Sequence, residues 1–253
     1  MDILRSVIIA FSMYSRVPMP RVAWNKKSMR FSLAFFPLVG AVEGVLFYAL
    51  WRVLCLPALH VPPLFRGAVL MSFPFFYTGG IHMDGFMDTA DALGSNRSRE
   101  EKLKILKDPH AGSFAVLSAG LYLVFYFALV GSFTSGAQVM TLSFAFVLSR
   151  VLSAAALILL PNARGEGSAW TFTASSDRRF TAAALFIFGA FSFVSLLVFC
   201  GKPGVAAVPA AAAVFFVYLR TAMKEFGGLT GDLAGWFLCI AELAAAAAAA
   251  FFP

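Results

Sequence analysis

Long apolar stretches separated by short polar segments dominate the pattern of the chain. A helix that crosses the hydrocarbon layer of a bilayer, about 30 Å thick, needs about 20 mostly apolar residues. Seven stretches approach that length: residues 32–51, 64–81, 112–131, 137–160, 181–200, 204–220 and 233–252. The second and sixth are short, and Pro74 interrupts the second, so the pattern allows either seven crossings or six. We expect an all-α, polytopic membrane helix bundle that forms one integral-membrane domain over residues 1–253.

Residues 1–24 precede the first crossing and carry a pattern of their own. The apolar run from Ser6 to Tyr14 is short for a signal peptide, and no small-residue cleavage site precedes Arg16. We therefore expect a retained helix in the membrane interface, with arginines among the headgroups and aromatic side chains facing inward. These residues are Arg5, Arg16 and Arg21, and Phe11, Tyr14 and Trp24.

The composition supports a membrane protein and excludes a soluble or disordered chain. The chain is 60% hydrophobic and 13% charged, whereas soluble domains average about 45–50% apolar and about 25% charged residues. The net charge of +7 would suit nucleic acid, but in a polytopic protein positive charge usually marks cytoplasmic loops. We expect no nucleic-acid partner.

The basic residues are distributed unevenly between the two sides of the predicted bundle. Seven crossings place residues 1–31, 82–111, 161–180 and 220–232 on one side, and these segments hold 16 of the 20 lysines and arginines. Because such residues stay in the cytoplasm, the pattern predicts a cytoplasmic N-terminus.

The densest polar stretch directly follows the second apolar stretch. Asp84, Asp88 and Asp91 are spaced i, i+4 and i+7, so they share one helix face, where like charges destabilise the helix unless a cation lies among them. Mg²⁺ is commonly held by one or two carboxylates and substrate phosphates. His82 is placed to orient a carboxylate or handle a proton. The alternative is a helix N-terminus with favourable acidic residues and Asp84 as its cap; three carboxylates on one face favour the metal–phosphate site.

Two further loops carry candidate residues. Lys107, Asp108 and Gly112 stand at the mouth of the third crossing, where a cation and flexible backbone can meet phosphate oxygens. In the last loop, glycines 227, 231 and 235 recur every four residues, which fits close helix packing as well as a site. Asp232 favours the site, because a carboxylate at the membrane edge normally has a cation or a function.

Glu43, Arg150 and Glu242 lie deep within apolar stretches. Glu43 does not stay charged at such depth without a partner, and we expect it to pair with Arg150 of the fourth crossing. For Glu242 we expect a structural hydrogen bond inside the bundle.

The stretch from Gly80 to Asp91 resembles the GxHxDGxxDTxD signature of the cobalamin synthase family, also called adenosylcobinamide-GDP ribazoletransferase or cobalamin-5′-phosphate synthase. Supporting segments occur in the family's order at residues 15–20, 36–40, 107–112, 164–167 and 228–232, followed by Glu242. The chain departs from the pattern at three positions: His110 where the family has Arg, Ala115 where it has Gly, and Cys239 where relatives often carry Glu.

The resemblance implies a Mg²⁺-dependent, multi-pass transferase of the bacterial inner membrane, with its active-site loops in the cytoplasm. It would join adenosylcobinamide-GDP to α-ribazole or α-ribazole 5′-phosphate and release GMP. The ion would bind Asp84, Asp88 and Asp91. Asp232, or an Asp of the cluster that the metal does not fully engage, would be the base. Lys107, Arg16 or Arg164 would hold the GMP phosphate, and the other substrate-binding candidates are Asp108, Gly112, Glu166, Thr230 and Glu242.

Two other functions fit parts of the pattern. Another membrane alcohol phosphotransferase would carry an Ala-Arg pair after its first Asp-Gly, where this chain has Phe86 and Met87. A secondary transporter would show inverted repeats and carboxylates in broken midplane helices; no convincing repeat is present, although Glu43 and the interrupted second stretch fit it. Association with a second copy or with other cobalamin-assembly enzymes stays open.

Overall fold

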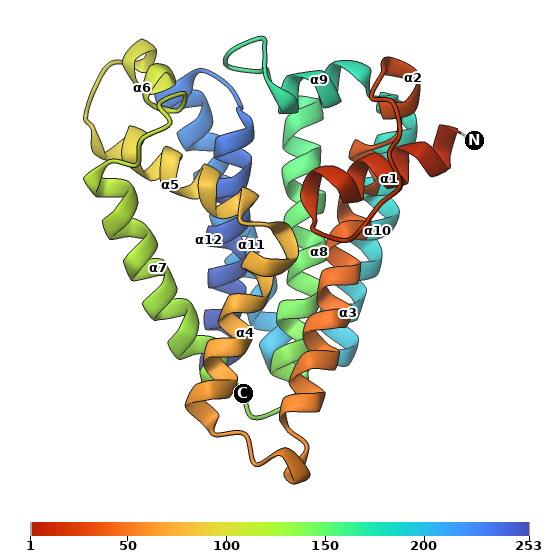
Figure 1. Cartoon of the computed structure of the whole chain (residues 1–253), viewed down its shortest axis with the longest axis vertical. Helices are drawn as coiled ribbons and strands as arrows, with labels where there is room; N and C mark the ends of the chain where they lie inside the picture. The colour runs from red at the N-terminus through yellow and green to blue at the C-terminus, as the bar shows by residue number, and fades with distance from the viewer. Residues whose placement is uncertain (1, 253) are drawn as a thin grey trace.

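The computed structural model describes residues 2–252 and shows a bundle of helices (Figure 1). Within that range no β-strand forms, and one isolated bridge joins Asn162 to Leu229. Six helical segments are long and apolar enough to cross a membrane: Lys26–Leu54 (α2 Lys26–Met29, η1 Leu33–Phe35 and α3 Phe36–Leu54), α7 Ser113–Gly131, α8 Gly136–Leu159, α10 Arg178–Phe199, Gly201–Phe226 (α11 Gly201–Thr221 and η3 Ala222–Phe226) and α12 Gly231–Phe251. The prediction of an all-α, polytopic membrane protein is confirmed.

The second predicted crossing is a short helix that continues through Pro74. Helix α4 (Pro63–Thr78) has 16 residues and Pro74 inside it, which corresponds to about 24 Å of rise, less than the hydrocarbon layer. It nevertheless runs from the loop with η2 (Pro57–Leu59) back toward the opposite end of the bundle (Figure 1). Helix α1 lies at one end of the bundle and α12 ends toward the other (Figure 1).

The sixth apolar stretch is short in the sequence, but the helical segment that contains it is long enough to cross a membrane. Its helical segment runs over 26 residues from Gly201 to Phe226, because the backbone continues past the apolar stretch through a π-helical turn at Ala222–Phe226. Hydropathy therefore underestimated this crossing, since the helix includes charged residues at its end.

The four basic segments gather at one end of the bundle, as predicted. The short helices α1 (Asp2–Tyr14), α5 (Ile81–Gly94), α6 (Arg99–Ile105) and α9 (Ser168–Ser175) lie at this end together with α2 (Figure 1). We call it the polar end. Charge asymmetry thus identified correctly which loops share a side.

Helix α1 forms as predicted, but two of its aromatic residues lie elsewhere than expected. Phe11 is 5% exposed and packs in the protein core, and the rings of Tyr14 and Phe36 lie 4.2 Å apart. The rings of Phe11 and Tyr14 face protein rather than lipid, because α1 packs against α3. Trp24 is exposed.

Helices α8 and α12 form the centre of the bundle. In their most apolar stretches, 61% of α8 and 67% of α12 are buried inside the protein, against 17–22% of α7, α10 and the segment Gly201–Phe226. The run of small residues from Ala244 to Ala250 allows neighbouring backbones to approach α12 closely. The outer helices expose large apolar side chains such as Phe186, Val198 and Phe216, which suits contact with lipid.

Candidate active site

The acidic signature lies on α5, which begins at a sharp turn after α4. Gly79 and Gly80 have φ of 68° and 81°, a left-handed conformation that glycine adopts at little cost. A side chain on Gly79 would also overlap the guanidinium of Arg16. The Arg16 amide donates to the Tyr77 carbonyl at 2.7 Å. The turn therefore directs α5 across the polar end of the bundle and holds Arg16 at its start.

Helices α5 and α12 contact each other through glycine. A Cβ on Gly85 would lie 2.7 Å from the carbonyl oxygen of Asp232, and a Cβ on Gly235 would lie 2.9 Å from that of His82. The two backbones thus touch where each carries acidic residues. Close packing, one of the two interpretations of the glycine repeat, is confirmed at this contact, and the site stays a prediction.

Carboxylates of the two helices converge, since Asp84 of α5 and Asp232 of α12 line one cavity. The pKa of Asp88 is raised to about 6, first by burial and then by the charges of Asp84 and Asp232, while Arg164 opposes the rise. Arg164 Nη2 lies 3.1 Å from Asp232 Oδ2. The contact between α5 and α12 therefore holds an excess of negative charge, with the Arg164 guanidinium beside it.

The residues fit a hard divalent ion, although not as a complete cage. Within residues 2–252, no three side chains of His, Cys, Asp or Glu are grouped as ligands of one ion, and the seven-residue spacing separates Asp84 from Asp91 by about 10 Å along the helix. Neighbouring pairs, Asp84 with Asp88 or Asp88 with Asp91, offer the one or two carboxylates that Mg²⁺ uses beside substrate phosphates. Burial, and then the neighbouring aspartates, raise the pKa of Asp88, and a cation beside it would favour the ionised form.

Two loops meet above α5. Lys107 forms an ion pair with Glu166, so the loop before α7 contacts the loop before α9. Gly112 lies against the Asp91 carboxylate, which a Cβ at this position would overlap. The structure brings these predicted residues to the same end as the aspartates. Asp108 is instead bonded within its own loop, accepting from His110 Nδ1 at 2.8 Å.

Two predicted substrate contacts have structural partners. The Thr230 hydroxyl caps α12 by accepting the amide of Leu233 at 3.2 Å. Glu242 is 5% exposed and accepts from Arg150 Nη1 at 2.9 Å, as the expected hydrogen bond inside the bundle. Their contact with substrate therefore stays a prediction from the resemblance.

A cavity of about 250 Å³ opens beside the acidic residues. Asp84 and His82 line it from α5, and Asp232 lines it from α12. Burial, with a smaller contribution from Arg150, lowers the pKa of His82 well below its usual range, so its imidazole is neutral at pH 7. Sequence reasoning missed three other lining residues, Tyr14, Phe36 and Ser153. Tyr14 and Phe36 adjoin segments that carry the family resemblance; a single serine in an apolar stretch gives no signal.

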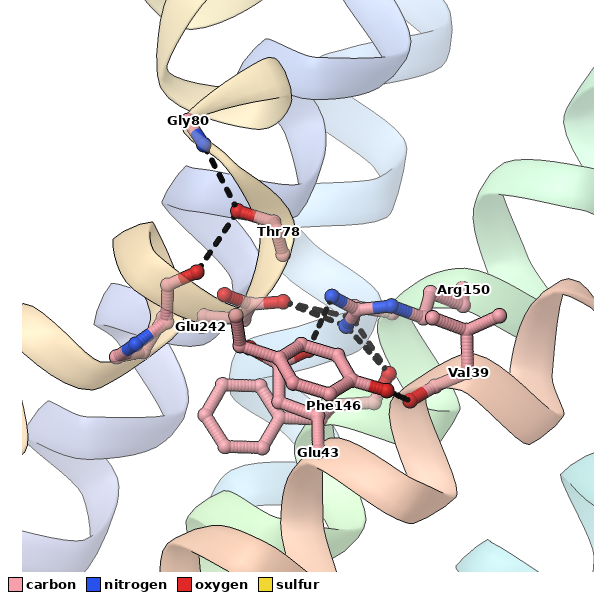
Figure 2. Close-up of polar contacts among 10 residues, drawn as sticks. Val39, Glu43, Thr78, Gly80, Phe146, Arg150 and Glu242 are labelled. Carbon is pink, nitrogen blue, oxygen red and sulfur yellow. Dashed lines mark hydrogen bonds and ion pairs between the residues drawn. The ribbon is translucent and has the colours of Figure 1, made fainter. Parts of the chain in front are cut away.

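A buried ion triad lies within the bundle (Figure 2). Arg150 Nη2 donates to Glu43 Oε2 at 2.6 Å, and Arg150 Nη1 bonds Glu242. This confirms the predicted pair and adds a third member. The Arg150 guanidinium lies 5.8 Å from the centre of the Phe36 ring, and Tyr77 donates to the Val39 carbonyl at 2.8 Å. The triad therefore joins α3, α8 and α12 next to the cavity wall.

Comparisons with known proteins agree on one family. The family model described as Cobalamin-5-phosphate synthase matches residues 6–250. The chain is similar to an adenosylcobinamide-GDP ribazoletransferase of Lachnoclostridium phytofermentans, with 38% identity over 96% of this chain and 92% of the relative. Proteins of the same name from Desulfitobacterium hafniense, 32% identical over 96% of this chain and 95% of the relative, and Clostridium perfringens, 31% identical over 94% of each, also match.

No solved structure matches the chain. The family match covers nearly the whole sequence, including every loop of the polar end. The chain belongs to the cobalamin-5-phosphate synthase family.

Proposed function

We propose that the protein joins adenosylcobinamide-GDP to α-ribazole or α-ribazole 5′-phosphate and releases GMP. The observation that carries the proposal is that Asp84 and Asp232, from two different helices, line one cavity, with Arg164 paired to Asp232. A ribose hydroxyl attacks a phosphorus of the diphosphate, so the site has to neutralise the diphosphate, accept the hydroxyl proton and stabilise the leaving GMP.

The α5 carboxylates provide the metal ligands in this proposal. Bound Mg²⁺ would supply charge neutralisation for the diphosphate and the leaving phosphate. Asp84 and Asp88, or Asp88 and Asp91, would hold the ion. Asp84, in the first turn of α5, lines the cavity.

Asp232 is the base that the geometry favours. It lines the cavity from α12, a different helix from the three predicted metal ligands, so it can accept the hydroxyl proton while they hold the ion. Its partner Arg164 has a guanidinium that forms bidentate bonds to phosphate. When the Arg164 guanidinium binds phosphate in place of Asp232, the Asp232 carboxylate is free to accept the proton.

Cations on the surrounding loops bind the leaving nucleotide. Arg16 lies at the start of α5, and Lys107 lies on the loop above it, paired with Glu166. The two side chains come from separate segments at the polar end of the bundle.

We also propose that the polar end faces the cytoplasm of a bacterium, in its inner membrane. The excess of basic residues at this end supports that orientation, and a nucleotide substrate is available on that side.

The test is a reaction of the purified protein with Mg²⁺, adenosylcobinamide-GDP and α-ribazole 5′-phosphate, followed by detection of GMP and the joined corrinoid. Asp84→Asn and Asp88→Asn should each reduce the rate at least 100-fold. The matched control is Asp177→Asn, since Asp177 caps α10 at the same end but lies outside the cavity. Wild-type rates in both site variants would refute the metal assignment, and absence of GMP with the wild-type protein would refute the function.

A further inference from the structure

Two stretches that are far apart in the chain meet at one side of the polar end. The amide of Asp177 donates to the carbonyl of Arg30 at 3.0 Å, and Arg30 Nη2 lies 2.5 Å from Asp177 Oδ2. The rings of Phe31 and Phe180 have their centroids 4.6 Å apart. The start of α10 therefore packs beside the residues that directly follow α2 (Figure 1).

This contact brings four basic side chains together on the surface. Lys26 and Lys27 begin α2, and Arg178 and Arg179 begin α10. All four are exposed, and we call them the basic patch. Among the residues that the structure describes, the one ion pair that any of them makes joins Lys27 to Asp2, at 3.8 Å. The protein therefore leaves most of the charge of the basic patch without a partner.

The opposite side of the polar end, around α6, pairs its cations with acids. Arg97 Nη1 lies 3.5 Å from Glu101 Oε1, and Lys102 Nζ lies 2.6 Å from Glu225 Oε2. The preference of basic residues for the cytoplasmic side explains why both groups lie at one end of the bundle. It does not explain why the unpaired cations gather at one side of that end, so the basic patch needs a local cause.

The basic patch lies at the depth of lipid headgroups. The segments Lys26–Leu54 and Arg178–Phe199 are both long and apolar enough to cross a membrane. The four cations thus occupy the first turns of two crossings that pack together, where the hydrocarbon layer meets the headgroup region. Trp24, just before the patch, is 48% exposed, and tryptophan is enriched at this level of membrane proteins.

The two arginines also stand where a helix disfavours cations. Arg178 and Arg179 are the first residues of α10, which has 22 residues. The helix dipole places partial positive charge at this terminus, so cations there are unfavourable. An anion that binds from outside the protein would offset this repulsion.

Depth identifies the kind of anion. None of the four cations lines the cavity beside Asp84 and Asp232, so the basic patch is separate from the proposed site of the reaction. Anionic phospholipids present their phosphates at the depth of the patch. Basic residues near a membrane surface attract such lipids, and each contributes about a fivefold gain in binding.

We propose that the basic patch binds the phosphate groups of anionic phospholipids. The headgroup lies between the starts of α2 and α10, and the acyl chains follow exposed apolar side chains of α10 such as Phe186 and Ile187. The inference does not depend on the reaction proposed above.

The test measures which lipids stay bound to the full-length protein. The protein is placed in nanodiscs of phosphatidylcholine with phosphatidylglycerol as the minor component, and native mass spectrometry counts the lipids that remain after release. Relative to the share of each lipid in the bilayer, the wild type should retain phosphatidylglycerol at least tenfold better than phosphatidylcholine. Equal retention of the two lipids would overturn the proposal.

Two double variants each remove half of the basic patch. Lys26→Gln with Lys27→Gln, and separately Arg178→Gln with Arg179→Gln, should each lower the preference for phosphatidylglycerol at least fivefold, because two of four charges are lost. The arginine variant removes cations that the helix dipole disfavours, so it keeps the test valid should the lysine variant fold poorly. An unchanged preference in the arginine variant would refute the site.

The matched control removes the same charge from the other side of the polar end. Arg97→Gln with Lys104→Gln changes two exposed residues at α6 and should leave the preference within twofold of the wild type. An equal loss in the control and the patch variants would reveal a general attraction between the polar end and anionic membranes, and it would overturn the proposal of a defined site.

Competition distinguishes a lipid site from a site for soluble anions. Inorganic phosphate or GMP is added before lipid release and compared with sodium chloride at the same ionic strength. Bound phosphatidylglycerol should be unaffected by the identity of the salt. Its selective displacement by phosphate or GMP would assign the basic patch to a soluble anion and would also overturn the proposal.

Discussion

Replacement of Arg150 by Met should destabilise the protein more than any other single change in the buried triad. Arg150 is fully buried and is bonded to Glu43 at 2.6 Å and to Glu242 at 2.9 Å. Its loss leaves two carboxylates that are 0% and 5% exposed without a cation. Removal of one partner from a buried ion pair costs about 3–5 kcal/mol, and here two acids lose their partner together.

Glu43→Gln should cost less, about 1.5–3 kcal/mol, which is the range for one hydrogen bond to a charged group. The remaining Arg150–Glu242 pair is electrically neutral, and the Gln carbonyl can still accept from the guanidinium. Arg150→Met should not be rescued by Glu43→Gln alone, since Glu242 stays without a partner. The triple variant with Glu43→Gln and Glu242→Gln should recover most of the lost stability.

The assay is equilibrium unfolding in mixed micelles with increasing SDS, followed by far-UV circular dichroism. Arg52→Met is the control, because Arg52 is exposed and such changes are usually within about 0.5 kcal/mol. A cycle of the three substitutions gives the coupling between them. If Arg150→Met costs no more than Glu43→Gln, or if the three changes simply add, the triad does not stabilise the bundle in the way argued.

Three further predictions follow from the polar end. The pKa of Asp88 is raised from 3.8 to about 6, so folding disfavours its ionisation, and the stability due to this group is highest below pH 4 and is lost as the pH rises through 6. Mg²⁺ affinity, measured by titration, should rise over the same pH range. A midpoint of the Mg²⁺ affinity near pH 4 would contradict the site. Gly112→Ala should lower activity at least tenfold by displacing the Asp91 carboxylate, whereas Gly120→Ala, with open space around it, should leave the rate unchanged. Lys107→Glu should weaken activity. The double variant Lys107→Glu with Glu166→Lys reverses the ion pair, so resistance to proteolysis should show that the loop contact is restored. If Lys107 binds the GMP phosphate, product inhibition by GMP should not return in this double variant.

Several features of the fold followed from the sequence because they depend on composition and local spacing. Five crossings agreed with the helices within a few residues, and the location of the basic residues predicted which loops share one end. The short α4 and the long α11 were harder, because Pro74 weakens one helix and a π-helical turn extends the other past its apolar stretch. Hydropathy indicates which side chains favour lipid, and it does not indicate where the hydrogen-bonded helix ends.

The candidate site shows the same division. The spacing of Asp84, Asp88 and Asp91 determined that they share a helix, and the depth of Glu43 determined that it needs a partner, since both conclusions follow from helix geometry and the cost of buried charge. Only the tertiary structure decided that Asp232 joins them, that Glu242 shares Arg150, and that His82 faces a cavity. These contacts join residues up to 150 positions apart in the chain, and they depend on how closely glycine lets α5 approach α12, which no local pattern specifies.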